Sequence, residues 1–302
     1  MGRKIAEPKS VGLERSCGNG HRDWLRYAPA APGIGRLEAF FTGHAYDDHR
    51  HDTYALGLTL SGVQSFDYRG ARQDSAAGQV MVLHPDESHN GRAGVVEGFR
   101  YRMIYVAPHL ITAALGGRVR HLPFLREAVS QEPHLVAALR QALGDIDQPL
   151  EELAADNVVT TLAEALIAND PTARKSARGR PQKNAYREAD LARQFLDAHC
   201  AELVTSDALE KVSGLDRFSL TRQFRTHFGT APYNYLVMRR LERARDLLVA
   251  GESFAEAALQ AGFADQSHFI RQFKRAYGVT PGHWRQMIRA AGRGANGSGP
   301  VA

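Results

Sequence analysis

Residues 222–232 read RQFRTHFGTAP, and residues 271–281, 49 positions further on, read RQFKRAYGVTP. About eight of the eleven positions are identical or chemically equivalent, which marks a duplicated structural unit. In each copy the aromatic residues lie one helical turn apart, and a glycine follows them. This spacing predicts a helix with a buried aromatic stripe that ends at the glycine.

The first copy predicts a helix-turn-helix. Thr205 or Ser206 is a suitable N-cap for a short helix, Gly214 permits a tight turn, and a second helix is expected over 217–228. Because each residue turns the helix by about 100°, four of its residues fall on the side away from the core. These outward residues are Phe218, Thr221, Arg222 and Arg225. A free helix face that carries arginine suits the DNA major groove.

The second copy repeats this pattern. Ser253 is the expected cap, Gly262 the turn, and 265–277 the second helix. Its expected outward residues are Gln266, Ser267, Ile270, Arg271 and Lys274. Glutamine suits adenine, and isoleucine can meet a thymine methyl group.

A single helix over 233–248, about 25 Å long, is expected to join the two units. Two second helices held at its ends can reach successive major grooves, about 34 Å apart. Its four arginines are expected to be solvated or to contact phosphates: Arg239, Arg240, Arg243 and Arg245. One helix-turn-helix could belong to an ordinary helical bundle, but two copies with outward arginines indicate that double-stranded DNA is the partner.

The front of the chain predicts a different structure. Short apolar or β-branched segments, such as 54–60 and 80–83, recur between 37 and 107 without intervening helices, which favours an antiparallel sandwich or barrel. A helix with an apolar stripe follows over 150–166. The fold class is therefore α+β: an N-terminal antiparallel β-barrel with following helices, then an all-α domain of two helix-turn-helix units.

Charge separates the expected domains. Residues 1–170 carry 17 Lys and Arg against 21 Asp and Glu, whereas 171–187 carry six basic residues and no acid. We expect a sensing and dimerisation domain over 1–170, a basic linker over 171–187, a DNA-binding domain over 188–290 that folds alone, and a flexible tail over 291–302. The linker is interpreted as a plain tether or, through Arg178 and Arg180, as an arm for the minor groove.

The composition indicates a cytoplasmic protein with no membrane partner. No apolar run approaches the ~20 residues of a membrane span, and the first ten residues lack the apolar segment of a secretory signal. Cys17 and Cys200 lie far apart and form neither a disulfide framework nor a metal motif.

The rear half resembles the AraC family of transcriptional regulators from Glu188 to about Arg289. The resemblance rests on 257–263 (AALQAGF), 267–269 (SHF) and 277–281 (YGVTP). It implies base-facing roles for one set of residues: Phe218, Thr221, Arg222, Gln266, Ser267, His268 and Arg271. It also implies a homodimer and, if the protein is an activator, contact with RNA polymerase. We expect the homodimer to pair through the apolar helix over 150–166; the alternative is that this helix covers the barrel of its own domain.

The front half is similar to the family's cupin-type sensing domain. Gly43, His49, His51 and Gly62 keep the spacing of the first cupin motif, and Gly78, Pro85 and His89 approximate the second. Ala55 stands where a metal cupin places a glutamate. Three imidazoles could still bind iron, zinc or manganese, but the missing carboxylate favours no metal and no cofactor, and so no enzyme activity.

The expected role of the front domain is to bind a small organic effector. The polar candidates in the barrel are His49, His51, Tyr54, Tyr68, His84, His89, Arg100 and Arg102. A ligand signal could pass through contact between the acidic front and the basic linker. Three alternatives stay open: a metal-dependent cupin enzyme with a DNA module, a constitutive regulator without effector, and an alkyl-transfer DNA repair protein, which would need a reactive cysteine.

Overall fold

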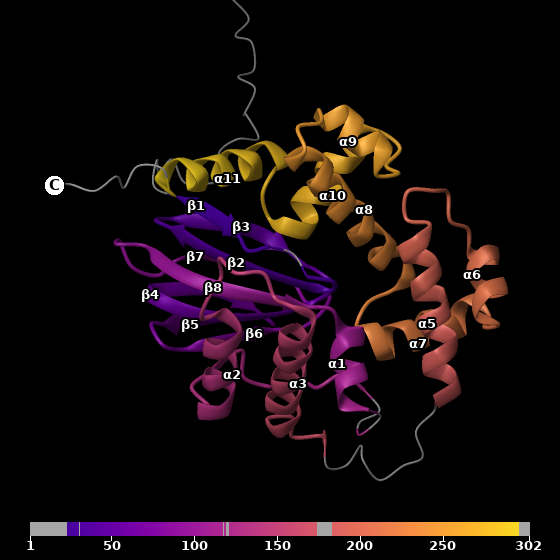
Figure 1. Cartoon of the computed structure of the whole chain (residues 1–302), viewed down its shortest axis with the longest axis horizontal. Helices are drawn as coiled ribbons and strands as arrows, with labels where there is room; N and C mark the ends of the chain where they lie inside the picture. The colour runs from indigo at the N-terminus through magenta and orange to yellow at the C-terminus, as the bar shows by residue number, and fades with distance from the viewer. Residues whose placement is uncertain (1–22, 30, 117, 119–120, 174–182, 296–302) are drawn as a thin grey trace, which may run out of the picture.

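The computed structural model describes residues 23–295 of the 302-residue chain, apart from residues 30, 117, 119–120 and 174–182. Cys17, Arg178, Arg180, most of the expected linker and the last seven residues of the expected tail lie outside the described residues. The described chain begins with an antiparallel sheet and continues through helices that cover one face of this sheet. It ends in a helical half that covers a second face of the sheet (Figure 1).

The described residues form a sheet of nine strands. They are β1 (Trp24–Tyr27), β2 (Ile34–Phe41), β3 (His44–His49), β4 (Tyr54–Tyr68), β5 (Ala71–Ala76), β6 (Val80–Leu83), β7 (His89–Ala93), β8 (Phe99–Val106) and β9 (Val129–Ser130). All pairings are antiparallel. The long strand β4 pairs with β6 and β8 at its start and with β5 and β7 at its end, so it belongs to both layers of a folded sheet.

The α+β class and the antiparallel sheet are confirmed, but the sheet is not a closed barrel. Among the described residues β1 pairs only with β2, and β3 only with β7. These two edges are covered by helices instead: α11 packs on β1 and α10 on β3. The backbone N–H groups of Asp47 and Arg50 donate to the carbonyls of Gly278 and Arg275, so the rear half satisfies hydrogen bonds that barrel closure would otherwise have used.

Ten helices are described. They are α1 (Pro108–Leu115), α2 (Pro133–Leu143), α3 (Glu152–Ala168), α5 (Lys183–Ala198), α6 (Ser206–Ser213), α7 (Arg217–Phe228), α8 (Pro232–Val249), α9 (Phe254–Gln260), α10 (Gln266–Tyr277) and α11 (Pro281–Ala295). Helix α5 therefore begins inside the stretch expected as linker, and α11 runs into the stretch expected as tail. Every helix among the described residues is too short or too polar to cross a membrane.

The apolar stripe of α3 is buried within its own chain. Val158, Leu162 and Leu166 pack with α1, α2 and the sheet, and Leu162 and Leu166 are fully buried. The stripe therefore packs within its own domain and is not the surface through which the helix over 150–166 was expected to pair. The exposed side of α3 carries Leu153, whose exposure is 83%.

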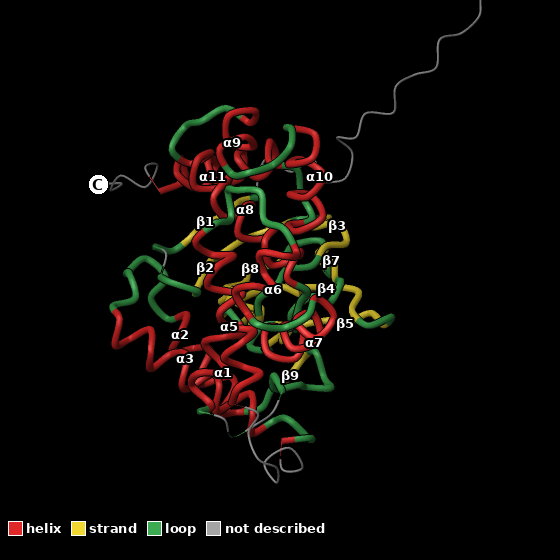
Figure 2. Tube along the Cα trace, turned by 90° about the vertical axis from the view of Figure 1, so that its right-hand side faces the viewer, coloured by secondary structure: helices red, strands yellow, loops and turns green. Residues whose placement is uncertain are grey.

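The two helix-turn-helix units begin and end where the sequence predicts. Thr205 caps α6, Asp216 caps α7, and Ser253 forms a capping box with Glu256 at α9. In Figure 2, α6 and α7 lie below α9 and α10, and α8 connects the two units.

The core of the second unit is continuous with the core of the sheet. Phe273 and Trp284 of the rear half belong to the same buried cluster as Leu25, Phe41 and Tyr101 of the sheet. The first unit instead has a separate core with α5, centred on Phe224 and Phe228. The rear half is thus joined to the front mainly through its second unit.

Candidate DNA-binding face and ligand pocket

Helix α7 presents its expected residues to the outside. The Asp216 carboxylate accepts from the backbone N–H groups of Phe218 and Ser219 and thereby fixes the start of the helix. Phe218 is 71% exposed, Arg222 and Arg225 are exposed, and Thr221 is half-buried. Arg222 donates to Ser219 of its own helix, at 2.8 Å.

Helix α10 presents most of its expected residues in the same way. Gln266, Ser267 and Arg271 are exposed, whereas half-buried His268 packs edge-to-face on Phe263, with ring centres 5.4 Å apart. Lys274 lies 2.8 Å from the Asp47 carboxylate of β3. Lys274, one of the nine residues expected to contact DNA, is therefore paired with a residue of the front half.

The arginines of α8 are not solvated in the way the sequence suggests. Arg239 and Arg245 face the front half, while Arg240 donates to the Cys200 and Glu202 carbonyls and Arg243 to that of Gln260. For Arg239 and Arg245 this arrangement corrects the expectation that the side chains are solvated or contact phosphates, whereas the Arg243 side chain is exposed.

A cavity of about 410 Å³ lies between the sheet and α8, α10 and α11. Leu37, Phe66, Met81, Leu83 and Met103 form its apolar floor. Met238, Arg239, Glu242, Arg245, Tyr277 and Trp284 of the rear half complete its wall. A ligand in this cavity would therefore contact both halves of the chain, and its volume is typical of small-molecule sites.

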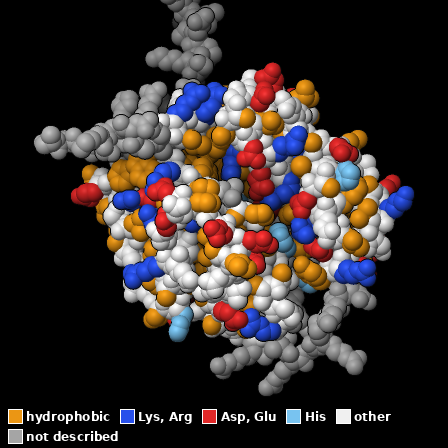
Figure 3. Space-filling model, in the orientation of Figure 1, with side chains coloured by type: hydrophobic (Ala, Val, Ile, Leu, Met, Phe, Trp, Pro, Cys, Tyr) orange, Lys and Arg blue, Asp and Glu red, His pale blue; other side chains and the backbone are white. Residues whose placement is uncertain are grey.

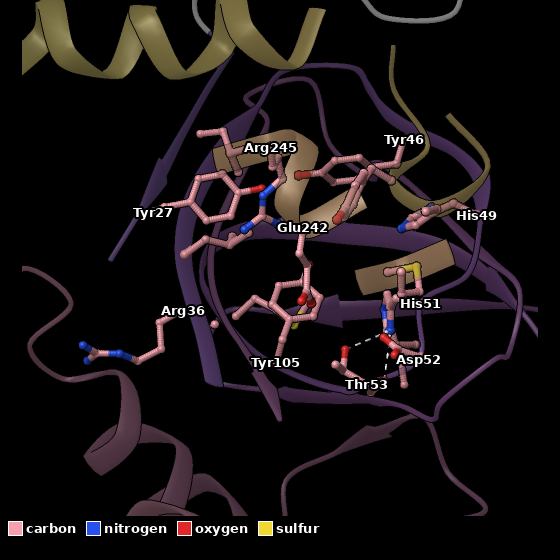
Figure 4. Close-up of a pocket in the computed structure, with 18 of the residues that line it drawn as sticks. Tyr27, Arg36, Tyr46, His49, His51, Asp52, Thr53, Tyr105, Glu242 and Arg245 are labelled. Carbon is pink, nitrogen blue, oxygen red and sulfur yellow. Dashed lines mark hydrogen bonds between the residues drawn. The ribbon is translucent and has the colours of Figure 1, made fainter. Parts of the chain in front are cut away.

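Helix α8 supplies charged groups to the pocket. Figure 4 shows Glu242 and Arg245 pointing into the space near Tyr27, Tyr46 and Tyr105, whereas Arg36 points away. The Arg36 guanidinium donates to the carbonyls of Asp145 and Gln148, outside the cavity.

Three histidines from the sheet line the same cavity. The ring centres of His49, His51 and His89 lie 4.2–6.2 Å apart. Each Nδ1 lies 2.8–3.0 Å from a backbone carbonyl, respectively of Asp47, Thr53 and Glu87. A carbonyl can only accept, so each Nδ1 carries the proton and each Nε2 of the neutral ring carries a lone pair.

Burial keeps these three imidazoles neutral. It lowers the pKa of His49 to about 4 and that of His51 to about 3, and it lowers the pKa of His89 well below its ordinary range. In the part of the chain that the structure describes, no group of three or more His, Cys, Asp or Glu side chains has an arrangement that could hold a metal ion.

Aromatic side chains enclose the other side of the cavity. The Tyr46 and Tyr101 hydroxyl oxygens are 2.8 Å apart. The Arg245 guanidinium stacks over Tyr27 at 4.9 Å and Tyr277 at 5.6 Å from the ring centres. Trp284 Nε1 donates to the Tyr27 hydroxyl at 3.1 Å. The aromatic wall thus joins β1 to α8, α10 and α11.

A buried charge cluster lies at the edge of the cavity. Arg239 Nη2 is 2.8 Å from Asp52 Oδ2, and Arg239 Nη1 is 2.9 Å from Glu242 Oε2. Burial raises the pKa of Asp52, and the Arg239 charge opposes this shift. The Glu242 side chain is 41% exposed because it borders the cavity. Desolvation by the surrounding protein nevertheless raises the pKa of Glu242 to about 6.

Of the eight residues expected to bind an effector, only His49, His51 and His89 line the cavity. Tyr54 lies on the opposite face of β4 and donates to the Pro123 carbonyl. Tyr68 and His84 hydrogen-bond to each other beside Glu87.

The two arginines of that set, Arg100 and Arg102, form ion pairs with buried Glu38 on the outer face of β8. Arg102 also holds the sheet to the end of α2, because it donates to the Leu143 and Gly144 carbonyls. Neither reaches the cavity lining.

Sequence reasoning missed the tyrosines and the α8 charges of the pocket. Tyr46 and Tyr105 carry no motif that separates them from core tyrosines. Glu242 and Arg245 are three residues apart, and this spacing does place them on one helix face.

The comparisons with known proteins agree with this arrangement. The family described as AraC-like ligand binding domain matches residues 31–166, and the family described as helix-turn-helix domain matches residues 209–287. The HTH-type transcriptional regulator YbfI of Bacillus subtilis is 28% identical over 227 residues, covering 74% of this chain and 81% of that protein. The HTH-type transcriptional activator RhaS of Escherichia coli is 28% identical over 252 residues, covering 80% and 88%.

Among solved structures, ToxT from Vibrio cholerae shares the fold with a TM-score of 0.59 at 13% identity, covering 87% of this chain and 100% of that one. A ligand-binding domain followed by a helix-turn-helix domain defines a DNA-binding transcription regulator. The chain thus has the two domains of an AraC-type transcription regulator, in the same order as they are named here.

Proposed function

We propose that this regulator reads DNA through the outward faces of α7 and α10 and responds to a small effector bound between its two halves. The observation that carries the proposal is the composition of the cavity, because α8, the helix that joins the two DNA-binding units, contributes Arg239, Glu242 and Arg245 to its wall. A ligand there would bear directly on the helix that sets the spacing of the two units.

DNA contact is assigned to nine residues: Phe218, Thr221, Arg222, Arg225, Gln266, Ser267, His268, Arg271 and Lys274. The exposed Arg222 and Arg271 are the main candidates for base readout, since arginine can bind guanine edges through two hydrogen bonds. On the face that Figure 3 shows, Lys and Arg side chains alternate with Asp and Glu.

Coupling between effector and DNA is assigned to the contact of β3 with the end of α10. Gly278 has φ +69°, and a Cβ there would lie 2.6 Å from the Asp47 carbonyl, so the two backbones approach as closely as glycine allows. Lys274 pairs with Asp47, and His49 ends the same strand inside the pocket. A ligand that shifts β3 would thereby release or retain a DNA-contacting lysine.

The remaining features of the proposal concern location and assembly. The protein acts in the cytoplasm as a homodimer, without catalysis or a bound metal, and contacts RNA polymerase if it is an activator. The exposed side of α3, with Leu153, is the surface we assign to the dimer, because the inner side is already buried. In ToxT, crystal structures hold an unsaturated fatty acid and a naphthyl-butenoic acid, which supports small-molecule binding by this fold.

The proposal is tested by selecting bound DNA from a random pool with the full-length protein and then screening metabolites by thermal shift. Compounds that raise the unfolding temperature should also change the affinity for the selected DNA by fivefold or more, as expected for a coupled pair of sites. Ligands that bind tightly but leave the DNA affinity unchanged would contradict it.

A further inference from the structure

One large apolar side chain lies on the outside of the first reading helix. Phe218 is the second residue of α7 and is 71% exposed. The core stripe of the same helix consists of Leu220, Phe224 and Phe228, which are all buried, so the Phe218 ring points away from this core. An exposed aromatic ring stabilises any complex in which a partner covers it, because its apolar surface then leaves water.

Two polar side chains next to Phe218 are held within the first unit. Arg217 Nε is 3.0 Å from the Glu210 carboxylate, and the Thr221 hydroxyl donates to the Arg217 carbonyl. Arg222, one helical turn after Phe218, is exposed and uses one guanidinium nitrogen within its own helix, so it keeps further N–H groups for a base. The first turns of α7 thus offer DNA an apolar ring beside an arginine.

The second unit differs at this position. Ser267 follows Phe218 by 49 residues in the repeat, and it carries a hydroxyl group where the first unit has the ring. Both side chains are exposed near the start of their helices. The residues near the start of a recognition helix are those that contact base edges. The ring therefore belongs to what distinguishes the base preference of the first unit from that of the second.

The major groove offers one feature that suits a phenyl ring. Its base edges present hydrogen-bond donors and acceptors, and thymine alone among the four bases adds a methyl group there. A phenyl ring can satisfy none of the donors or acceptors, but it gains by covering a methyl group. An apolar contact of this kind selects a base without a hydrogen bond.

We infer that Phe218 reads the 5-methyl group of a pyrimidine in the half-site bound by α7. This inference rests on the proposed function, which places α7 in the major groove. Phe218 and Arg222 are about 6 Å apart along the helix, and successive bases are about 3.4 Å apart. The methyl group therefore lies within about two base pairs of the guanine that Arg222 reads.

The ring detects the methyl group and not the hydrogen-bonding groups of the base. At the same position it therefore favours 5-methylcytosine over cytosine, just as it favours thymine over deoxyuridine. Binding by the first unit then responds to cytosine methylation wherever a site carries cytosine at this position.

The test uses the full-length protein and a site selected from a random DNA pool. The α7 half of this site is the half in which Arg222→Ala relaxes the base preference. Each thymine of that half is replaced in turn by deoxyuridine, which lacks only the methyl group. For the parent protein at least one replacement should weaken binding by about fourfold, the effect of one buried methyl-sized group. At that position 5-methylcytosine should bind more tightly than cytosine by a similar factor.

Variants of the side chain assign the effect to Phe218. Phe218→Ala should bind the thymine and deoxyuridine sites equally, because no ring remains to cover the methyl group. Phe218→Leu, which stays apolar, should keep part of the difference. Leu203→Ala, at a side chain that is 90% exposed in the loop before α6, is the matched control and should keep the parent's affinity and the full difference. Unfolding temperatures equal to that of the parent show that the variants are folded.

Three results would overturn the inference. The first is a Phe218→Ala protein that distinguishes thymine from deoxyuridine as the parent does, and the second is one that binds every site with the parent's affinity. The third is an equal loss on both DNAs relative to a parent that does not distinguish them, since the ring would then act as a wedge between bases.

None of these results affects the proposed function while Arg222→Ala still relaxes the base preference. An Arg222→Ala protein with the parent's affinity and preference would instead remove α7 from DNA, and the proposed function with it.

Discussion

Asp52 and Arg239 form an ion pair of 2.8 Å between residues 187 positions apart, one in the loop before β4 and the other on α8. The Asp52 side chain is 3% exposed and that of Arg239 16%, so the pair is buried where the two halves meet. Removing one partner of a buried pair leaves an uncompensated charge.

We therefore expect Arg239→Met to lower the free energy of unfolding by about 3 kcal/mol in urea melts. The double variant Asp52→Asn with Arg239→Met should recover part of that loss, because the buried Asp52 charge is then also removed and only the 41% exposed Glu242 side chain has lost its partner. Arg72→Met, at an exposed ion pair with Asp74, should cost less than about 1 kcal/mol. Equal losses in all three proteins would show that the junction does not depend on this pair.

The buried histidines predict that acid destabilises the fold. The folded pKa values of His49 and His51, about 4 and about 3, lie below the unfolded value near 6.5. The unfolded chain thus binds more protons below pH 6.5, and stability falls as the pH drops from 6.5 towards 4, by about 1.4 kcal/mol per pH unit for each such histidine. His49→Gln should reduce this slope in urea melts at pH 7, 6 and 5, while His134→Gln, at an exposed position, should not. Identical slopes for the parent and His49→Gln would mean that this imidazole is not buried neutral.

The two sides of α3 predict opposite phenotypes. Leu162 is fully buried, so Leu162→Glu should unfold the front half, with loss of more than about 4 kcal/mol. Leu153 is 83% exposed, so Leu153→Glu should leave the circular dichroism unchanged and convert a dimer to a monomer in light scattering. A Leu153→Glu protein that remains dimeric would place the dimer contact elsewhere.

The pair between Asp47 and Lys274 predicts a gain of DNA affinity when it is broken. In Asp47→Asn the lysine loses its carboxylate partner, and one added phosphate contact should steepen the salt dependence of binding by about 0.9 in the log–log slope. Fluorescence anisotropy at several salt concentrations measures this, with Asp74→Asn as the control. An unchanged or shallower slope would show that Lys274 does not reach DNA.

The helical repeat could be predicted closely from the sequence because its signals are local. Caps such as Ser253, turns such as Gly214 and stripes such as Phe269 with Phe273 depend on residues within one or two turns. The expected helix over 233–248 differs from α8 by one residue at each end.

The pocket could not be predicted in the same way. Side chains alternate between the two faces of β4, so Tyr54 and Leu56 lie on the face opposite to Ala55. This alternation does not show which face meets the helices of the front half and which face borders the cavity. The contribution of α8 depends on pairings across more than 180 residues, and no local pattern encodes these.

The most direct test of the account is the affinity of the Arg222→Ala and Arg271→Ala variants for DNA selected from a random pool by the parent protein. Each variant should lose about 1–3 kcal/mol of binding free energy and should relax base preference in one half of the site, a different half for each. Exposed Arg140→Ala, on α2, should bind as the parent does. If both variants bind the selected site with the parent's affinity and base preference, α7 and α10 are not the helices that read DNA.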